Sequence, residues 1–228
     1  MIKKLISIIL TILIFALVSL TVFLNYRQQF SIDRSKLPSK VEASEGFQKW
    51  ITNLRNKDIK LEADEFRLLE ENEIYNTKWL KIYSIDAPGI KDTFEKTLKD
   101  QHVVKQSAFS PSEREFIDYR HEQREDFLPN EIRYYGRMDD NVLDARLLNC
   151  DISANCYFDR AYFLSNELFV VSEFVLNNPL NKDKIICDIA VKCEYVVKIH
   201  VVDLINNSRL VYVSKPFNLV LSEAIPNF

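Results

Sequence analysis

The feature that most constrains this chain is an uninterrupted apolar run near its beginning. Residues 5–24 contain no charged residue, glycine or proline, and they follow the short basic start Met1-Ile2-Lys3-Lys4. A helix of about twenty residues spans roughly 30 Å, which is the hydrocarbon thickness of a bilayer. The run therefore predicts a transmembrane helix within residues 1–26, in contact with the lipid bilayer through residues 5–24.

Two other interpretations of this run compete with an anchor. A cleaved signal peptide has an apolar region of about 7–15 residues that ends at a small-x-small cleavage site. Here the run is longer, and its alanine, Ala16, is followed by Leu17 and Val18. We expect an uncleaved anchor, with a cleaved signal peptide and a buried helix of a soluble protein as the alternatives.

The charge distribution argues against binding to nucleic acid. Two of the 30 basic residues and none of the 33 acidic residues precede residue 27, so the rest of the chain carries a net charge of −5. Proteins that bind nucleic acid gain much of their affinity from neutralising phosphates with a basic surface. A mildly acidic domain without a basic stripe is a poor candidate for that class.

Glycine is scarce, and this scarcity excludes several enzyme classes. The chain has three glycines, Gly46, Gly89 and Gly136, and no two lie close together. Phosphate-binding loops, dinucleotide-binding turns and the nucleophile elbow all need clustered glycines, because the backbone must turn sharply or approach a ligand closely. We therefore expect no nucleotide cofactor, and we identify no cofactor of another kind.

The chain beyond the anchor divides into a linker, residues 27–43, and one α+β domain, residues 44–228. Phe47, Trp50, Ile51 and Leu54 have helical spacing and predict a helix from about 44 to 57. A second short helix follows Pro88-Gly89. A third, charged helix is predicted over 111–127, because Ser110, Pro111 and Glu113 resemble a capped helix start. Residues 59–63, 65–69 and 78–85 read as strands.

From residue 131 onward the pattern is almost entirely that of strands. The predicted segments, rich in Val, Ile, Leu, Phe and Tyr, are 131–137, 142–148, 157–164, 168–176, 185–204, 209–214 and 217–222. Asn206-Asn207 and Ser165-Asn166 are suited to tight hairpin turns. The fold class predicted is thus α+β, with short helices and a predominantly antiparallel sheet or sandwich.

All four cysteines lie in two heptapeptides of the form C-D-I-x-x-x-C, at 150–156 and 187–193. The repeat suggests a duplicated strand-and-hairpin unit, and Cys150, Cys156, Cys187 and Cys193 are disulfide candidates. If the strands are unbroken, bridges would join one copy to the other; if each heptapeptide turns, the bridges are local. Ala190-Val191 disfavours a turn in the second copy. Four buried thiols are the alternative, and the usual two-residue spacing of zinc-binding cysteine pairs is absent.

The cysteines also suggest a compartment. Disulfides persist where the surroundings are oxidising, so an even number of cysteines beyond an apparent anchor favours a domain outside the cytoplasm. Basic residues flank both ends of the apolar run and leave the orientation rule nearly balanced. We expect a single-pass protein of the cytoplasmic (inner) membrane, with its large domain outside.

Few residues suggest chemistry, and no catalytic, cofactor-binding or metal-binding residue is assigned. His200 is expected to be an exposed strand histidine, because Asp203, three residues on, points to the opposite face. His121 falls in the charged helix, and His102 near the end of a helix. Asp139-Asp140-Asn141 with Asp144 is dense in oxygen ligands but is expected to form a turn.

These observations favour a membrane-anchored envelope protein over an enzyme. The expected role is binding of a protein partner in the envelope, of an accessory, assembly or immunity type. The alternative is an envelope hydrolase with an unrecognised active site. A pocket joining His200 or His121 to carboxylates would favour the hydrolase, and an exposed apolar patch or an unpaired edge strand would favour the binding protein.

Overall fold

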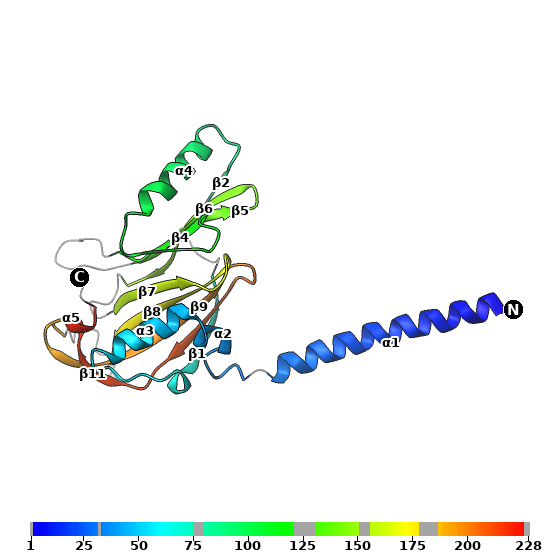
Figure 1. Cartoon of the computed structure of the whole chain (residues 1–228), viewed down its shortest axis with the longest axis horizontal. Helices are drawn as coiled ribbons and strands as arrows, with labels where there is room; N and C mark the ends of the chain where they lie inside the picture. Colours follow the sequence, from blue (N-terminus) through cyan, green and yellow to red (C-terminus); the bar gives the residue numbers. More distant parts are fainter. Residues whose placement is uncertain are drawn as a thin grey trace. The chain divides into compact units, whose positions relative to one another are not determined.

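The structure is a computed structural model that describes residues 2–31, 33–74, 80–120, 131–150, 156–177 and 187–225, and the side chains of the first helix at positions 10–24. The chain divides into two units, Met1–Ser35 and Lys36–Phe228. Figure 1 shows both units.

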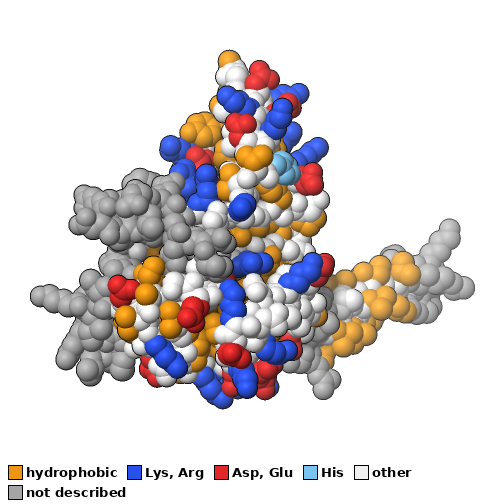
Figure 2. All heavy atoms as spheres, turned by 60° about the vertical axis from the view of Figure 1, so that its left-hand side comes forward, with side chains coloured by type: hydrophobic (Ala, Val, Ile, Leu, Met, Phe, Trp, Pro, Cys, Tyr) orange, Lys and Arg blue, Asp and Glu red, His pale blue; other side chains and the backbone are white. Residues whose placement is uncertain are grey.

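The first unit is a single helix, α1 (Ile2–Ser31). Between residues 10 and 24 its large apolar side chains are exposed, and Figure 2 shows them along the helix. The Thr21 hydroxyl is bonded within the helix, to the carbonyl oxygens of Leu17 and Val18 at 3.1 and 2.8 Å. A helix over the apolar run is thus confirmed, whereas a transmembrane span is not. Among the residues that the structure describes, no helix is both long and apolar enough to cross a membrane.

The second unit contains two antiparallel sheets. In the first, sheet A, the strand order is β1 (Arg67–Glu73), β10 (Ser208–Val213), β9 (Lys192–Asp203), β8 (Leu168–Leu176) and β7 (Cys156–Phe163), while β11 (Phe217–Val220) pairs with the start of β9. In the second, sheet B, the order is β2 (Leu80–Ser84), β6 (Asn141–Asn149), β5 (Glu131–Met138), β4 (Glu115–Asp118) and β3 (Ser107–Phe109). An α+β domain dominated by antiparallel strands is therefore confirmed.

The sheets and two helices form four layers (Figure 1). Helix α3 (Glu45–Arg55) covers the outer face of sheet A, where Trp50 and Leu54 join a cluster with Phe174 and Val197. Helix α4 (Ile90–Gln101) packs through Phe94 on the outer face of sheet B. The inner faces of the two sheets pack on each other. The short helices α2 (Ser39–Glu42), η1 (Ala63–Glu65) and α5 (Leu221–Ala224) complete the described elements.

Strand β9 shows why the sheets stack as they do. Its odd positions, including Val197 and Ile199, face α3, whereas Val202 belongs to the cluster between the sheets. Successive side chains of a strand point to opposite faces. Strand β9 is therefore buried on both faces, by α3 on one side and by sheet B on the other. Sheet B contributes Ile117, Ile132 and other side chains to the same inner cluster.

The sequence pattern placed most elements correctly. The two helices expected near 44–57 and after Pro88-Gly89 are α3 and α4, and Ser44 caps α3 by accepting a hydrogen bond from the Phe47 amide. Both predicted hairpin turns join neighbouring strands, at 164–168 and 203–208. The alternating segment 59–63, however, is not a strand, although Ile59 and Leu61 are buried.

The predicted helix over 111–127 is wrong in its described part. Residues 111–114 form a turn with Glu113 at φ +58°, and the chain then enters strand β4. Ser110 and Ser112 donate hydrogen bonds to the Glu115 carboxylate, and Ile117 is fully buried. The serines that resembled a helix cap therefore stabilise the turn between β3 and β4. The chain forms a hairpin here instead of a helix, because strand pairing buries Phe116 and Ile117. Residues 121–130 lie outside the described residues.

The linker expected over 27–43 also differs from the structure. Helix α1 continues to Ser31, and the second unit already begins at Lys36. Leu37 and Val41 are buried in the core beneath α3. The burial could not be predicted from the sequence, because two isolated apolar residues in a polar stretch show no periodic pattern.

Both disulfides are local. Cys150 is bonded to Cys156 and Cys187 to Cys193, each across a sequence separation of 6. Strand β9 begins only at Lys192, so the unbroken strand expected from residue 185 is wrong where the structure describes it, from Cys187. Asp188 forms a turn where Ala190-Val191 predicted none, since its carboxylate accepts a hydrogen bond from the Ala190 amide and its carbonyl accepts one from the Val191 amide.

Candidate functional site

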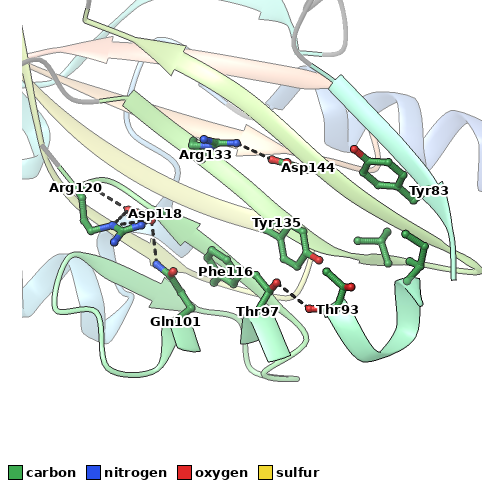
Figure 3. Close-up of a pocket in the computed structure, with 12 residues that line it drawn as sticks. Tyr83, Thr93, Thr97, Gln101, Phe116, Asp118, Arg120, Arg133, Tyr135 and Asp144 are labelled. Atoms are coloured by element: carbon green, nitrogen blue, oxygen red, sulfur yellow. Dashed lines mark hydrogen bonds and ion pairs between the residues drawn. The ribbon is translucent and has the colours of Figure 1, made fainter. Parts of the chain in front are cut away.

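One hollow in the second unit lies between α4 and the outer face of sheet B, and we name it the α4 groove (Figure 3). Its volume is about 520 Å³. Its lining comprises Tyr83, Ile90, Thr93, Thr97, Gln101, Phe116, Asp118, Arg120, Arg133, Tyr135, Val142 and Asp144. Alternate residues of β4, β5 and β6 therefore supply its floor, and one face of α4 supplies its wall.

The charges of the α4 groove are paired with one another. Arg120 contacts both oxygens of Asp118 at 2.5–3.0 Å, and the Gln101 amide donates to the same carboxylate at 3.1 Å. Arg133 donates to Asp144 at 3.2 Å. Each arginine has a carboxylate partner, so the positive charges of the groove are balanced by negative ones. The groove is therefore not suited to bind an anion.

The middle of the α4 groove is aromatic. The ring of Tyr135 packs on Phe94 and on Phe116, with centroid distances of 5.7 and 5.4 Å. Burial raises the pKa of the Tyr135 phenol above its ordinary value, against a hydrogen bond with Thr97 that lowers it. Tyr135 is thus a neutral, partly apolar surface at neutral pH.

The second hollow lies beside the other face of β2, and we name it the β2 hollow. Its volume is about 680 Å³. Apolar side chains dominate its wall: Leu80, Ile82, Tyr134, Met138, Leu143, Leu204 and Ile205. Its polar members are Glu115, Arg137, Asp139, Asn141, Asn166 and Glu167. Neither hollow is lined by a histidine or a cysteine.

Strand β2 separates the two hollows and is an edge of sheet B. Within the described ranges it pairs only with β6. Ile82 is 58% exposed and borders the β2 hollow, whereas Tyr83 is 40% exposed and borders the α4 groove. An edge strand leaves every second backbone N–H and C=O without a ladder partner, so it can accept an additional strand.

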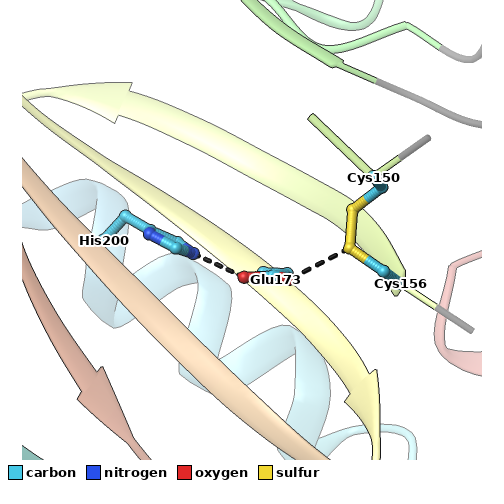
Figure 4. The surroundings of a disulfide bond; sticks show 4 residues. All are labelled: Cys150, Cys156, Glu173 and His200. Atoms are coloured by element: carbon cyan, nitrogen blue, oxygen red, sulfur yellow. Dashed lines mark hydrogen bonds and ion pairs between the residues drawn. A yellow bond between two sulfur atoms is a disulfide. The ribbon is translucent and has the colours of Figure 1, made fainter. Parts of the chain in front are cut away.

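His200 is not the exposed histidine that the sequence predicted. It is 5% exposed, and its Nε2 donates to Oε2 of Glu173 at 2.6 Å (Figure 4). The prediction failed because the polar even positions of β9 face sheet B rather than water. Asp203 is not its partner: its carboxylate binds Asn206 instead.

Glu173 lies between His200 and the first disulfide. Burial acts to raise the pKa of its carboxyl, but the hydrogen bond from His200 and the charges of His200, Lys198 and Arg209 outweigh it and hold that pKa below its ordinary value. Its other oxygen, Oε1, is 3.0 Å from Sγ of Cys156. Sequence alone could not find this cluster, because its members come from separate strands.

The remaining predicted positions have structural roles. Asp139, at φ +52°, forms the turn between β5 and β6, as expected. Asp140 and Asp144 pair with Arg137 and Arg133 and do not converge on one point. His102 ends helix α4 and stacks on Phe109 with a centroid distance of 4.0 Å. His121 lies outside the described residues.

No protein-family model matches the chain, and no curated protein or solved structure is significantly similar to it.

Proposed function

We propose that the chain is a single-pass protein of the cytoplasmic membrane whose β-rich domain binds a protein partner outside the cytoplasm. The observation that carries this proposal is the open edge of β2, with a hollow on each of its faces. Such an edge takes up an extended segment through backbone hydrogen bonds, while the adjoining pockets select its side chains.

The two hollows suggest what kind of segment would fit. An added strand alternates its side chains between the two faces of the sheet. The apolar wall around Ile82 and Ile205 suits aliphatic or aromatic side chains on one face. Tyr83 and the paired charges of the α4 groove suit polar, uncharged side chains on the other. The partner would thus present an extended segment with alternating apolar and polar residues.

The membrane anchor is the second part of the proposal. It is supported by the uncharged run 5–24, by the continuous helix α1 and by its exposed apolar side chains from Leu10 to Leu24. The two disulfides support a domain in an oxidising compartment. An anchor would keep the domain near partners in the same layer and so raise its effective concentration. Accessory, assembly and immunity-type roles all fit this arrangement.

No specific observation favours the hydrolase alternative. The buried pair of His200 and Glu173 lines neither hollow, and the carboxylates of the α4 groove are bonded to arginines. A general base must reach its substrate within hydrogen-bond distance.

The binding edge can be tested by photo-crosslinking. A crosslinking amino acid in place of Ile82 is expected to give one discrete adduct in intact membranes. The control position is Leu69, a 50% exposed apolar residue on β1, an edge strand of sheet A. Equal adducts at both positions, or none at Ile82, would contradict the proposal. With the crosslinker at Ile205, the additional change Ile82→Lys is expected to remove most of the adduct.

Topology can be tested on intact cells stripped of any outer layer. An amine reagent that cannot cross membranes is expected to label the exposed lysines of the second unit without lysis, while a cytosolic marker stays unlabelled. Carbonate-washed membranes should retain the full chain with Met1 or Ile2 as its first residue. Labelling only after lysis would reverse the orientation, and a shortened soluble chain would indicate a cleaved signal peptide.

A further inference from the structure

The disulfide Cys150–Cys156 lies between the two sheets. Cys150 directly follows β6 of sheet B, and Cys156 is the first residue of β7 of sheet A. The two cysteines are 2% and 8% exposed and belong to the apolar cluster between the sheets. This bond is therefore a covalent link from one layer to the other at a buried position.

Two polar side chains of sheet A lie beside this disulfide: Glu173 contacts Cys156, and His200 is bonded to Glu173 (Figure 4). One sulfur from each cysteine and one carboxylate oxygen of Glu173 all lie within 4.8 Å of one another. The other carboxylate oxygen accepts the hydrogen bond from His200. His200 Nδ1 is buried and has no hydrogen-bond partner among the described residues.

The contact between Glu173 and Cys156 is poorly matched to a disulfide. A disulfide sulfur carries no proton, so a carboxylate oxygen 3.0 Å away meets sulfur lone pairs instead of a donor. A thiol would donate its proton to that oxygen. A cation placed between the groups would attract both sulfurs and the carboxylate. The geometry is thus better suited to a reduced pair than to the oxidised one.

We propose that Cys150, Cys156 and Glu173 form a zinc site when the disulfide is reduced, with His200 positioning Glu173. Zinc takes thiolate, imidazole and carboxylate ligands in tetrahedral sites, and three protein ligands leave a fourth position for water. A ligating carboxylate is commonly held by a hydrogen bond from a second residue, which is the place of His200 here. The metal would replace the disulfide as the bridge between the sheets.

The chemical step is a reduction followed by metal binding. A dithiol transfers two electrons and two protons to the disulfide; the sulfur–sulfur bond breaks, and the dithiol becomes a cyclic disulfide. Zn²⁺ then binds the two cysteine sulfurs and releases their two protons to solvent. The proposal does not rest on partner binding, since neither hollow includes these residues.

The second disulfide provides a matched control. Cys187 and Cys193 have the same sequence separation, but in the part of the chain that is described they belong to no group of three metal-binding side chains. Reduction of this pair should therefore create no site of comparable affinity.

The test uses the full chain in detergent with Cys187→Ser and Cys193→Ser, reduced with a dithiol and freed from it without air. Titration with Co²⁺ is expected to give thiolate-to-cobalt charge-transfer absorption that saturates at one ion per chain and is displaced by Zn²⁺. Cys150→Ser with Cys156→Ser, in a chain that keeps the second pair, should give no such absorption at the same concentrations. Glu173→Gln and His200→Gln should each weaken binding by roughly 10–100-fold.

The proposal would be overturned by the absence of charge-transfer absorption in the reduced chain, by equal metal binding in the oxidised chain, or by unchanged affinity after Glu173→Gln. Circular dichroism of each reduced variant controls for folding. If the reduced chain loses its fold, Zn²⁺ should restore it, because the metal binds only the assembled site. A reduced chain that stays unfolded with Zn²⁺ would also overturn the proposal.

Discussion

At the scale of single residues, the buried polar groups on the two faces of sheet A differ in their hydrogen bonding. On the inner face, Glu173 accepts a hydrogen bond from His200 Nε2, next to the apolar cluster that contains Phe158. On the outer face, the Tyr195 hydroxyl is buried without a hydrogen-bond partner among the described residues. Burial raises the pKa of this phenol from 10.0 to about 12, with a smaller contribution from Tyr157.

Tyr195 should make the fold sensitive to alkali. Between pH 10 and about pH 12 the unfolded phenol ionises while the folded one stays neutral, so its contribution to stability is complete below pH 10 and is lost as the pH rises. Tyr195→Phe removes this contribution, and the free energy of unfolding should fall less steeply over that interval. Denaturant titrations at several pH values measure both slopes; equal slopes would contradict the prediction.

Gly46→Ala should destabilise the domain, although a change from glycine to alanine usually stabilises a helix. Gly→Ala at an exposed helix position gains about 1 kcal/mol. A Cβ at Gly46, however, would lie 2.7 Å from two ring atoms of Tyr162. We expect Gly46→Ala to cost about 1–3 kcal/mol instead, because the ring must move. The cost should shrink in a Tyr162→Ala background, and a rise in stability from Gly46→Ala alone would disprove the clash.

At the scale of elements, short capping contacts hold the first helices of the second unit together. The Ser44 hydroxyl donates to the Val41 carbonyl at the end of α2 at 2.7 Å and accepts the Phe47 amide of α3 at 3.3 Å. Ser44 therefore fixes the corner from which α3 crosses sheet A.

Replacing this cap should destabilise the domain by about 1 kcal/mol. Ser44→Ala leaves the Phe47 amide and the Val41 carbonyl without their partner, so the midpoint of chemical unfolding should decrease with little change in its slope. Thr52→Ala, on the exposed side of α3, is the control and should cost nothing or stabilise slightly. Similar losses for both variants would show that capping is not the cause.

At the scale of the whole molecule, the two disulfides act on different parts of the fold. Cys150–Cys156 joins the two sheets, whereas Cys187–Cys193 closes the turn that enters β9. Each closes a loop of the same size, and chain entropy alone gives about 2 kcal/mol of stabilisation for such a loop. Any difference between them therefore reports on packing in the folded state.

We expect removal of the bridge between the sheets to be the more damaging change. Cys150→Ala with Cys156→Ala loses the loop constraint and also leaves a void in the inner cluster, for a total of about 3–4 kcal/mol. Cys187→Ala with Cys193→Ala should lose about 2 kcal/mol. Denaturant unfolding of the two variants compares them directly, and an equal or reversed order would contradict the assigned positions.

The strands that carry the candidate site could be predicted from the sequence, but the site itself could not, for physical reasons. The sequence predicts a strand over 78–85, and β2 lies within that range. Strand β2 is an edge because it pairs with one strand within the described residues. Local periodicity does not show which distant segments pair, so the edge could not be predicted. The misread Ser110-Pro111 turn shows the same limit: one capping pattern fits a helix start and a hairpin, and packing of Phe116 and Ile117 decides between them.

The sequence by itself determined the helix at the start, the α+β class, the strand-rich second half and the presence of four cysteines at matched spacing. Each depends on residues close together in the chain, where periodicity and turn chemistry act. Only the tertiary structure decided that His200 is buried, that the disulfides are local, and that Glu173 meets a sulfur between two sheets. Whether a polar strand face meets water depends on what packs against it, and sheet B covers the face that would otherwise be exposed.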